Sequence, residues 1–549
     1  MFPYLRISLV GTTQPDVTGD AALDRTCRLL LVPVFLFLVG FFWFASRHRF
    51  IDIDEGYYLL ASRLVLQQHK VPYLDFFYQQ APLLPYAYGL WMKLFGISWF
   101  SARSFSATLT ITVGLLLYEH VCHETRRWAA GLSAVALYAS STFIFGWFPI
   151  AKTFSLATVF LFGTYVIIAR LTTASPPWLV AVAGLLFGLS VDTRSYVVGL
   201  APIFLWWVFR YSESSNRIAR IRWFLGGFTI GCVPSLWLFV ASPERFLFNN
   251  LGYHALRSVH GPFGGWGWKL RIARVLLFGV PGSRPMGSDL HAGNGFQFSL
   301  LWAVSFAGIL VLRMRRGPAL LAFMIAFGLG VISFLPNPAL MQYFSMCVPF
   351  LIVAAVCAAS DYVASLGGAR PKRIAVLASV VLLAAFVASS VPSFRVYLIT
   401  GPEVARGLKV EAFYRSPEVY AWTLDMVNAV SEAIDQVAAP NERIASFWPG
   451  YFFASRADPY PGFENNHGWY ITQKLTVEQR AKYHIITFSD MEAGFEAHTP
   501  RIAVFERTKT DPLDPGIVFS KILLSNGYTE LRTTGDVSIF VCCSTRRPQ

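Results

Sequence analysis

The sequence predicts a mainly α-helical membrane protein that crosses the bilayer many times and ends in a soluble α/β domain. Three observations lead to this fold class. Of the 549 residues, 54% are hydrophobic and only 14% are charged, and the mean hydropathy is +0.47. Apolar windows recur over the first 392 residues. From about residue 393 the composition becomes that of a soluble protein. A soluble enzyme with a polar surface would not be this apolar overall.

The apolar windows predict about eleven transmembrane helices, because each crossing needs about 20 apolar residues. Two of the windows are short for a crossing. Polar residues precede the first window and no small-residue cleavage site follows it, so we expect a retained span and not a cleaved signal. The windows cover residues 29–45, 101–118, 129–147, 153–169, 178–191, 196–209, 223–241, 296–312, 318–334, 343–360 and 374–391.

The placement of charge predicts the orientation of these helices. The net charge is +14, and basic residues gather beside apolar windows, as at 210–222, 313–316 and 370–373. This is the positive-inside pattern, which argues against a nucleic-acid partner. With a cytoplasmic N-terminus, all the basic loops fall on the cytoplasmic side. We therefore expect a multi-pass protein of a bacterial inner or plasma membrane.

Two domains follow from the same pattern. Residues 1–392 form the membrane domain, with surface helices in outer loops at about 46–100 and 242–295. Residues 393–549 form an extracytoplasmic α/β domain of ordinary size. Within it, the sequence predicts a helix over 417–436 and strands at 443–447, 484–488, 501–505 and 537–542.

Each outer loop contains predicted helices. In the first loop, the apolar spacing predicts an amphipathic helix over 55–67 that lies on the membrane surface, with Asp54 at its N-terminal end, and a second helix over Pro82 to Phe95. In the second loop, Ser242-Pro243-Glu244 begins a helix. His254 and Arg257 are three apart and share a face of that helix. The segment from Gly261 to Trp268 would then form a flap.

Adjacent carboxylates in the first loop are the main candidates for chemistry. Asp54 or Glu55 suits a general base that deprotonates an incoming nucleophile. The alternative is a helix cap followed by a favourable first-turn acid. We hold the two interpretations about even, because capping explains one acid but not the cluster of Asp52, Asp54, Glu55 and Asp75.

Cationic and aromatic residues lie at the predicted outer ends of spans. Arg103 and Arg194 have this position, while His254 and Arg257 lie on the second outer loop. Arginines at headgroup depth suit a lipid phosphate, although a single arginine there is more often a snorkelling anchor. Lys152 opens a span and is more simply an interfacial anchor, with a site role left open, and a tyrosine such as Tyr343 is common in the aromatic belt.

The remaining polar groups carry less information. The cysteines show neither a disulfide framework nor zinc spacing. In the C-terminal domain, a polar loop contains Asp458, Glu464, Asn465, Asn466 and His467. Loops of this kind are commonly solvated, so we place no catalysis there.

The first outer loop resembles a known family. Asp54-Glu55-Gly56-Tyr57-Tyr58, the segment Pro72 to Phe77 and Ala81-Pro82-Leu83 are similar to the first-loop signature of the C-type (GT-C) membrane glycosyltransferases. The group in question contains the protein O-mannosyltransferases and the lipid A aminoarabinose transferases. The loop signature is fairly specific. Weaker similarities extend it over most of the membrane domain, namely Arg103, the segment from Gly184 to Arg194, and the Gln342-Tyr343 pair.

The resemblance implies transfer of a sugar from a polyprenyl-phosphate carrier to an acceptor on the outer face, with inversion at the anomeric carbon. The acceptor would be a glycan, a lipid or a protein. By position, Asp54 corresponds to the catalytic acidic residue, with Glu55 as its partner. The expected substrate-binding set is Asp75, Tyr57, Gln80, Arg103, Arg194, His254, Arg257 and Tyr343. Of these, Arg103, Arg194 and Tyr343 would face the leaving phosphate.

Several alternatives stay open. Gln80-Ala81 stands where aminoarabinose transferases carry a Glu-Lys pair, and Gln342-Tyr343 where they carry Tyr-His, so lipid A is not favoured as the acceptor. A transporter or flippase of a lipid-linked sugar would share the many spans, although internal repeats are not evident. A noncatalytic partner in envelope glycan assembly is the third interpretation. No metal site is predicted, but a divalent cation at Asp54 or Asp75 is left open.

Overall fold

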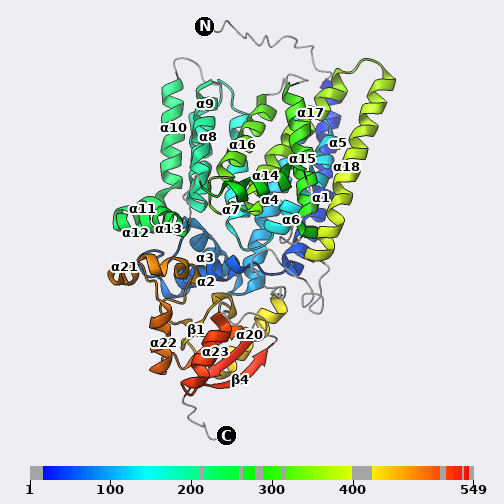
Figure 1. The fold of residues 1–549 in the computed structure, drawn as a ribbon. Coiled ribbons are helices and arrows are strands. Elements are labelled where there is room, and N and C mark those ends of the chain that lie inside the picture. Colours follow the sequence, from blue (N-terminus) through cyan, green and yellow to red (C-terminus); the bar gives the residue numbers. More distant parts are fainter. Residues whose placement is uncertain are drawn as a thin grey trace.

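The computed structural model describes residues 17–210, 216–258, 264–278, 288–310, 317–398, 423–506, 515–534 and 537–542. A bundle of apolar helices forms one part of the molecule, two helices lie across one end of the bundle, and a domain with a β-sheet follows beyond them (Figure 1). The expected fold class, a multi-pass helical membrane protein with a C-terminal α/β domain, is therefore confirmed.

Every predicted apolar window contains helix. In the described residues, four helical segments are long and apolar enough to cross a membrane, namely Arg25–His48, Trp99–Thr125, Met341–Ser365 and Ala369–Phe394. Six shorter apolar helices of 10–17 residues lie in the same bundle. The bundle helices are α1 (Val17–His48), α4 (Trp99–Thr125), α5 (Trp128–Ser140), α6 (Thr142–Trp147), α7 (Thr153–Ala169), α8 (Pro177–Thr193), α9 (Ala201–Arg210), α10 (Arg217–Gly231), α14 (Trp266–Phe278), α15 (Ser288–Leu310), α16 (Gly317–Ser333), α17 (Val348–Ser365) and α18 (Ala369–Leu398).

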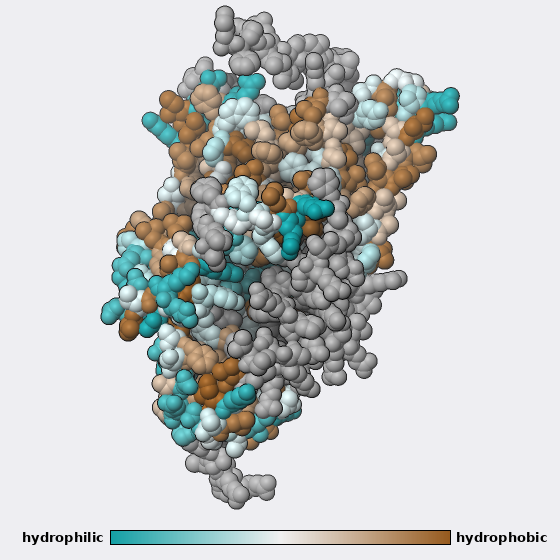
Figure 2. Space-filling model, in the orientation of Figure 1, coloured by the Kyte–Doolittle hydropathy of each residue, from teal (hydrophilic) through white to brown (hydrophobic). Residues whose placement is uncertain are grey.

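The bundle surface matches a bilayer environment. On the described part of the face in Figure 2, hydrophobic residues cover the sides of the bundle, and hydrophilic residues gather at its far end and over the opposite domain. Within the bundle, α8 and α10 approach closely through glycines. A Cβ on Gly184 would lie 2.0 Å from the carbonyl oxygen of Phe224, and one on Gly227 would lie 1.9 Å from that of Ala181. Such small-residue contacts are typical of packed transmembrane helices.

The window predicted over 223–241 does not form one continuous helix. After α10 the chain bends by 63° and continues as α11 (Val233–Ala241), which leaves the bundle (Figure 1). Pro234 follows the bend, and proline is favoured in the first turn of a new helix. The predicted helix start at Ser242 is confirmed as α12 (Pro243–Leu247), but a π-helical turn separates it from α13 (Tyr253–Arg257).

The predicted flap lies partly outside the described residues, which omit 259–263. Its last residues are regular, because α14 already begins at Trp266. The part of the predicted flap from Trp266 to Trp268 is therefore helical.

The two helices across the end of the bundle are α2 (Ile53–Gln68) and α3 (Leu83–Phe95), close to the predicted positions. Every residue of the first helix from Glu55 to Leu64 is buried within the protein, and its place at the membrane surface stays a prediction. The cover comes from α3, the start of α4 and the C-terminal domain, which pack on this helix in one continuous apolar core that contains Leu60, Tyr88, Trp448 and Phe452.

The C-terminal domain is built on a mixed five-stranded sheet with strand order β2-β1-β3-β5-β4. β1 pairs in parallel with β2 and β3, and β5 pairs antiparallel with β3 and β4. The elements are β1 (Arg443–Ser446), β2 (Asp458–Pro459), β3 (Ile502–Glu506), β4 (Thr529–Thr534) and β5 (Val537–Val541), with helices α20 (Leu424–Val437), α21 (Val477–Lys482), α22 (Phe488–Glu496) and α23 (Pro515–Ser525).

Three of the four predicted strands are confirmed in this sheet. The strand predicted at 484–488 is wrong, because the capping box of Thr487 and Asp490 begins α22 there. The predicted helix over 417–436 corresponds to α20, and residues 417–422 lie outside the described residues.

Two side chains attach the C-terminal domain to α2. The indole Nε1 of Trp448 donates to the carbonyl of Ile53 (2.8 Å), and the ring lies against Gly56, where a Cβ would be 2.6 Å from the same nitrogen. Buried Arg63 donates to the carbonyl of Phe452 (2.9 Å) and lies 3.2 Å from a carboxylate oxygen of Asp458. The domain is therefore fixed directly over the acidic N-terminal turn of α2.

Candidate active site

The site begins at the N-terminus of α2, where Asp52 and Glu55 form a capping box. Oδ1 of Asp52 accepts a hydrogen bond from the amide of Asp54 (3.0 Å), and the amide of Asp52 donates to Oε1 of Glu55 (2.8 Å). These reciprocal bonds satisfy amides that the first turn of a helix leaves unpaired. The capping interpretation therefore applies to Asp52 and Glu55, and Asp54 has no capping role.

Glu55 forms a buried ion pair with Arg103 of α4. Nε of Arg103 donates to Oε2 (2.9 Å) and Nη2 donates to Oε1 (2.6 Å). The other guanidinium N–H groups donate to the carbonyls of Ser46, Arg49 and Phe50. All five N–H groups of Arg103 thus have acceptors, and the side chain is 1% exposed. This contradicts the expectation that Arg103 faces a phosphate.

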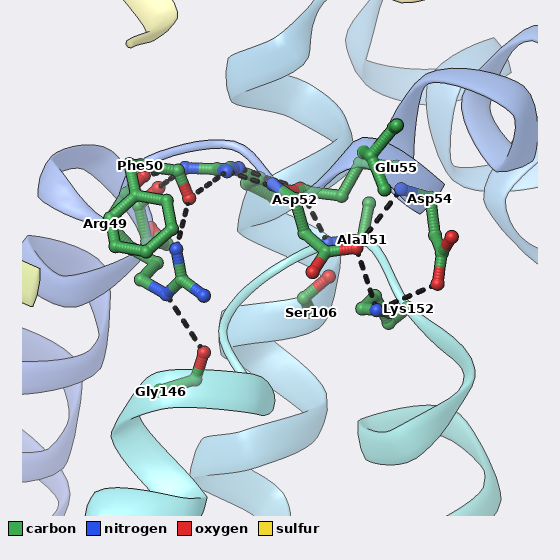
Figure 3. Close-up of polar contacts among 12 residues, drawn as sticks. Arg49, Phe50, Asp52, Asp54, Glu55, Ser106, Gly146, Ala151 and Lys152 are labelled. Carbon is green, nitrogen blue, oxygen red and sulfur yellow. Dashed lines mark hydrogen bonds and ion pairs between the residues drawn. The ribbon is translucent and has the colours of Figure 1, made fainter. Parts of the chain in front are cut away.

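Lys152 lies between the two aspartates of α2 (Figure 3). Its Nζ is 2.7 Å from Oδ1 of Asp52 and 2.9 Å from Oδ2 of Asp54. The amide of Ala151 donates to Oε2 of Glu55 (2.9 Å), which ties the segment before α7 to α2 and so places the lysine. Lys152, for which the sequence left a site role open, is at the centre of the cluster.

Burial and charge act in opposite directions on these groups. Burial alone raises the pKa of Asp54, but Lys152 and His467 together more than offset this effect through their charges and hydrogen bonds and hold the pKa below its usual value. Burial lowers the pKa of Lys152, and the two aspartates raise it above the usual value. Asp54 therefore stays an ionised carboxylate next to a protonated lysine.

The C-terminal domain contributes His467 to the same cluster. Its Nε2 lies 3.4 Å from Oδ1 of Asp54, and its ring packs edge-on against Tyr57, with 4.8 Å between the ring centroids. The adjacent Asn465 donates from Nδ2 to Oε1 of Gln79 in the first loop (2.6 Å). The sequence analysis expected the polar loop of the C-terminal domain to be only solvated. That expectation is wrong, because Asn465 and His467 of this loop contact the first outer loop.

Arg194, at the end of α8, is a buried cation without a carboxylate partner. Nη1 donates to the hydroxyl of Thr153, and Nε has no hydrogen-bond partner. Among the described residues, no carboxylate lies within ion-pair distance of its guanidinium. Three aromatic rings surround the guanidinium, with ring centroids 4.4–5.2 Å from Cζ. They belong to Phe154, Tyr196 and Tyr343.

Tyr343 lies against this arginine, with its ring centroid 5.2 Å from Cζ. Asp54, Lys152 and Arg257 are also near enough to act electrostatically on its hydroxyl. Arg257 comes from α13, and its Cζ lies 5.4 Å from the ring centroid of Tyr470 in the C-terminal domain. The structure thus brings the expected residues Asp54, Arg194, Arg257 and Tyr343 to one site.

Other expected residues lie elsewhere or play a local part. Asp75 is exposed, and its carboxylate accepts from the amide of Val71 (2.7 Å), so it closes a turn outside the cluster. Gln80 is half-buried, and its carbonyl accepts from the hydroxyl of Tyr73 (2.5 Å). His254 is exposed, with Nε2 3.1 Å from the carbonyl of Gln79.

A metal centre has no support in the described part of the chain. Those residues contain no group of three or more histidine, cysteine, aspartate or glutamate side chains that could hold an ion. Lys152 stands where a cation between Asp52 and Asp54 would have to bind. Asp75, the other carboxylate considered for a divalent cation, lies apart from this pair.

Comparison with known proteins gives a family match over part of the chain and a similar fold over most of it. Residues 79–238 match the family model described as dolichyl-phosphate-mannose-protein mannosyltransferase. These residues include Arg103, Lys152 and Arg194 and begin after Asp54. No curated protein is similar to the chain in sequence.

Two solved structures share the fold. ArnT from Cupriavidus metallidurans bound to undecaprenyl phosphate is 14% identical, with a TM-score of 0.57, and the match covers 95% of this chain and 99% of that one. The apo state of the same protein is 16% identical, with a TM-score of 0.57 and coverage of 93% and 97%. The predicted resemblance to C-type membrane glycosyltransferases is confirmed, in fold over most of the chain and in sequence over residues 79–238.

Proposed function

We propose that this protein is an inverting glycosyltransferase that moves a sugar from a polyprenyl-phosphate donor to an acceptor hydroxyl or similar group. The family match is to a transferase that uses a lipid-phosphate-linked sugar. The solved structure with undecaprenyl phosphate supports a polyprenyl carrier of this chemical class. A transporter or flippase is the alternative that the experiment below separates.

The observation that carries the proposal is that one site contains a partly buried ionised carboxylate, Asp54, and a buried cation, Arg194, without a carboxylate partner in the described part of the chain. Asp54 is the only acid of its turn that is free of the capping box, and Arg194 has no carboxylate partner among the described residues. An unpaired buried guanidinium is costly, by several kcal/mol in order of magnitude. An anionic ligand at Arg194 removes that cost, and a lipid phosphate is such a ligand.

The chemistry needs one proton acceptor and one anion site. The acceptor hydroxyl attacks the anomeric carbon and gives its proton to the carboxylate of Asp54. The bond from the anomeric carbon to the phosphate oxygen breaks on the opposite side, and its electron pair leaves with the polyprenyl phosphate. Arg194 and Arg257, with the hydroxyl of Tyr343, stabilise that anion. Glu55 and Lys152 position Asp54 and take no direct part.

We further propose that the reaction takes place on the outer face of the membrane. Arg126 and Arg127 follow α4 at the end of the bundle away from α2, and Arg370 and Arg373 lie in the first turns of α18. By the positive-inside rule this basic end is cytoplasmic. The C-terminal domain and the site beneath it are then extracytoplasmic.

The test is sugar transfer in lipid nanodiscs from a panel of synthetic polyprenyl-phosphate sugars, with cell-envelope extract as acceptor. We compare Asp54→Asn with Asp75→Asn, a matched control in the same loop whose carboxylate lies outside the cluster. Loss of a general base predicts a fall of about 10²–10⁴-fold for Asp54→Asn. The Asp75→Asn rate should stay within about twofold, because surface changes away from special features have small effects.

Two results would overturn the proposal. Equal transfer by the two variants would remove Asp54 from catalysis. Absence of transfer with every donor, while the protein moves lipid-linked sugar across liposomes, would establish the flippase.

A further inference from the structure

His467 is buried in an unusual way for a polar side chain. It is 9% exposed, and neither ring nitrogen has a partner with hydrogen-bond geometry. A buried imidazole left without partners is costly, so its placement calls for an explanation. The ion-pair distance of 3.4 Å from Nε2 to Oδ1 of Asp54 gives one.

His467 has contacts with both domains. Its amide donates to Oδ1 of Asn465 (3.0 Å), and the side chain amide of Asn465 donates to Gln79 (2.6 Å). The ring packs between Tyr57 of α2 and Tyr470, with centroid distances of 4.8 Å and 5.8 Å. Contacts from both domains therefore hold the imidazole in position before any substrate binds.

The ionisable groups that face His467 come from three elements. They are Asp54 and Tyr57 of α2, Tyr470 of its own segment, and His254 of α13. Asp54 is the single carboxylate in this set. Oδ2 of Asp54 already forms an ion pair with Lys152, and Nε2 of His467 lies next to the other oxygen, Oδ1.

We propose that His467 is a positioning residue of the active site: its Nε2–H donates to Oδ1 of Asp54, aims the carboxylate at the acceptor and keeps it ionised. The inference rests on the function proposed above. Catalytic hydrogen bonds that are long without substrate commonly shorten in the reactive complex, which fits a distance of 3.4 Å. The C-terminal domain is thereby part of the catalytic centre.

The experiment measures kcat/KM against pH in nanodiscs for three variants. His467→Phe keeps the ring contact with Tyr57 but removes the donor, whereas His467→Gln keeps an N–H donor. His498→Phe is the matched control, because His498 is exposed in the same domain and its Nε2 pairs with the carbonyl of Asn526 (2.8 Å), away from the site. Melting temperatures establish that each variant is folded. If His467→Phe does not fold, His467→Asn, which is too short to reach Asp54, takes its place.

We expect His467→Phe to lower kcat/KM about 10–100-fold, the range for a lost hydrogen bond to a charged group. The acidic limb of its kcat/KM–pH profile should also move to higher pH, because Asp54 then protonates more easily. His467→Gln should retain the wild-type limb and lose only a few-fold in rate. His498→Phe should match the wild type in both.

Two outcomes would overturn the inference. One is that His467→Phe has the kcat/KM of the wild type and the same acidic limb in its pH profile. The other is a loss that is equal at every pH and equal in His467→Gln, which would indicate packing alone. If Asp54→Asn is inactive, either of these results refutes the role of His467 and leaves the proposed base in place. Transfer that survives in Asp54→Asn refutes the proposed base itself.

Discussion

The carboxylate of Glu55 and the guanidinium of Arg103 form a two-point ion pair in which both side chains are at most 1% exposed. Glu55→Gln should destabilise the protein by about 3–5 kcal/mol, because it leaves Arg103 buried with half of its partner removed. Thermal or denaturant unfolding in detergent measures this effect.

The double variant Glu55→Leu with Arg103→Leu is the control, since it removes both charges and should recover part of the lost stability. If Glu55→Gln instead keeps its stability and loses transfer, Glu55 acts in the chemistry, as the sequence analysis expected.

Lys152 should be needed both for the stability of the protein and for the low pKa of Asp54. Lys152→Met leaves Asp52 and Asp54 without their cation, so we expect a loss of about 3–5 kcal/mol in unfolding free energy. The acid limb of activity should move to higher pH as the pKa of Asp54 rises. Adding Asp52→Asn to this variant should restore part of the stability without restoring transfer. Recovery of transfer by the double variant would contradict the arrangement.

Arg194 should be important for the donor and dispensable for folding. Arg194→Met removes a buried charge that has no carboxylate partner among the described residues, so stability should stay level or rise. Transfer should fall by about 10²–10³-fold, the range for one lost contact to transition-state charge.

Arg220→Met is the matched control for Arg194. Arg220 donates to the carbonyls of Thr172, Thr173 and Ser175, so its loss should lower the melting temperature and leave the KM for the donor unchanged. A stable Arg194→Met with a normal KM and rate would show that the phosphate binds elsewhere.

Gly56 should tolerate no side chain. In Gly56→Ala the new methyl group would lie 2.6 Å from Nε1 of Trp448 and 2.8 Å from the amide of Gly450. Overpacking of this kind costs about 1–3 kcal/mol, and we expect the C-terminal domain to become sensitive to protease as its contact loosens. Gly226→Ala, with nothing within 4 Å, should behave like the wild type. Equal proteolysis of the two variants would contradict the docking geometry.

The pKa of Asp54 predicts how stability depends on pH. Its folded value is below the unfolded value, which is about 3.9. A depressed acid contributes stability above the unfolded pKa, and the contribution is lost as pH falls through the folded pKa. Between pH 7 and 5 Asp54 should therefore cause no change, and the loss should begin below about pH 4. Melting curves of the wild type and Asp54→Asn should converge there, and parallel curves would refute the shift.

The fold was largely predictable because transmembrane helices are apolar over a fixed length. The windows located every bundle helix except α14, while the break at Cys232 was missed because α10 and α11 are both apolar. The burial of α2 was missed for a related reason. A helix covered by a second domain and a helix covered by lipid have similar apolar residues, so periodicity could not separate them.

The site was predictable only where the sequence is local. Asp54 was identified from the acidic turn, and the grouping of Arg194 with Tyr343 from the resemblance. Arg103 was misplaced because its position at a span end says nothing about which acceptors surround it. His467 was missed because only tertiary packing joins it to the first loop, and its sequence neighbours are those of an ordinary polar turn.

The contact of Trp448 with Ile53 has a consequence for the order of biosynthesis. The two residues are 395 positions apart, so Ile53 leaves the ribosome about 20–80 s earlier at 5–20 residues per second. During that interval α2 has its acidic turn but no cover and no histidine. The centre is complete only when nearly the whole chain has been made. With the role proposed for His467, a chain truncated before its last domain lacks a positioning residue of the centre, so a half-made protein should transfer sugar more slowly than the complete one.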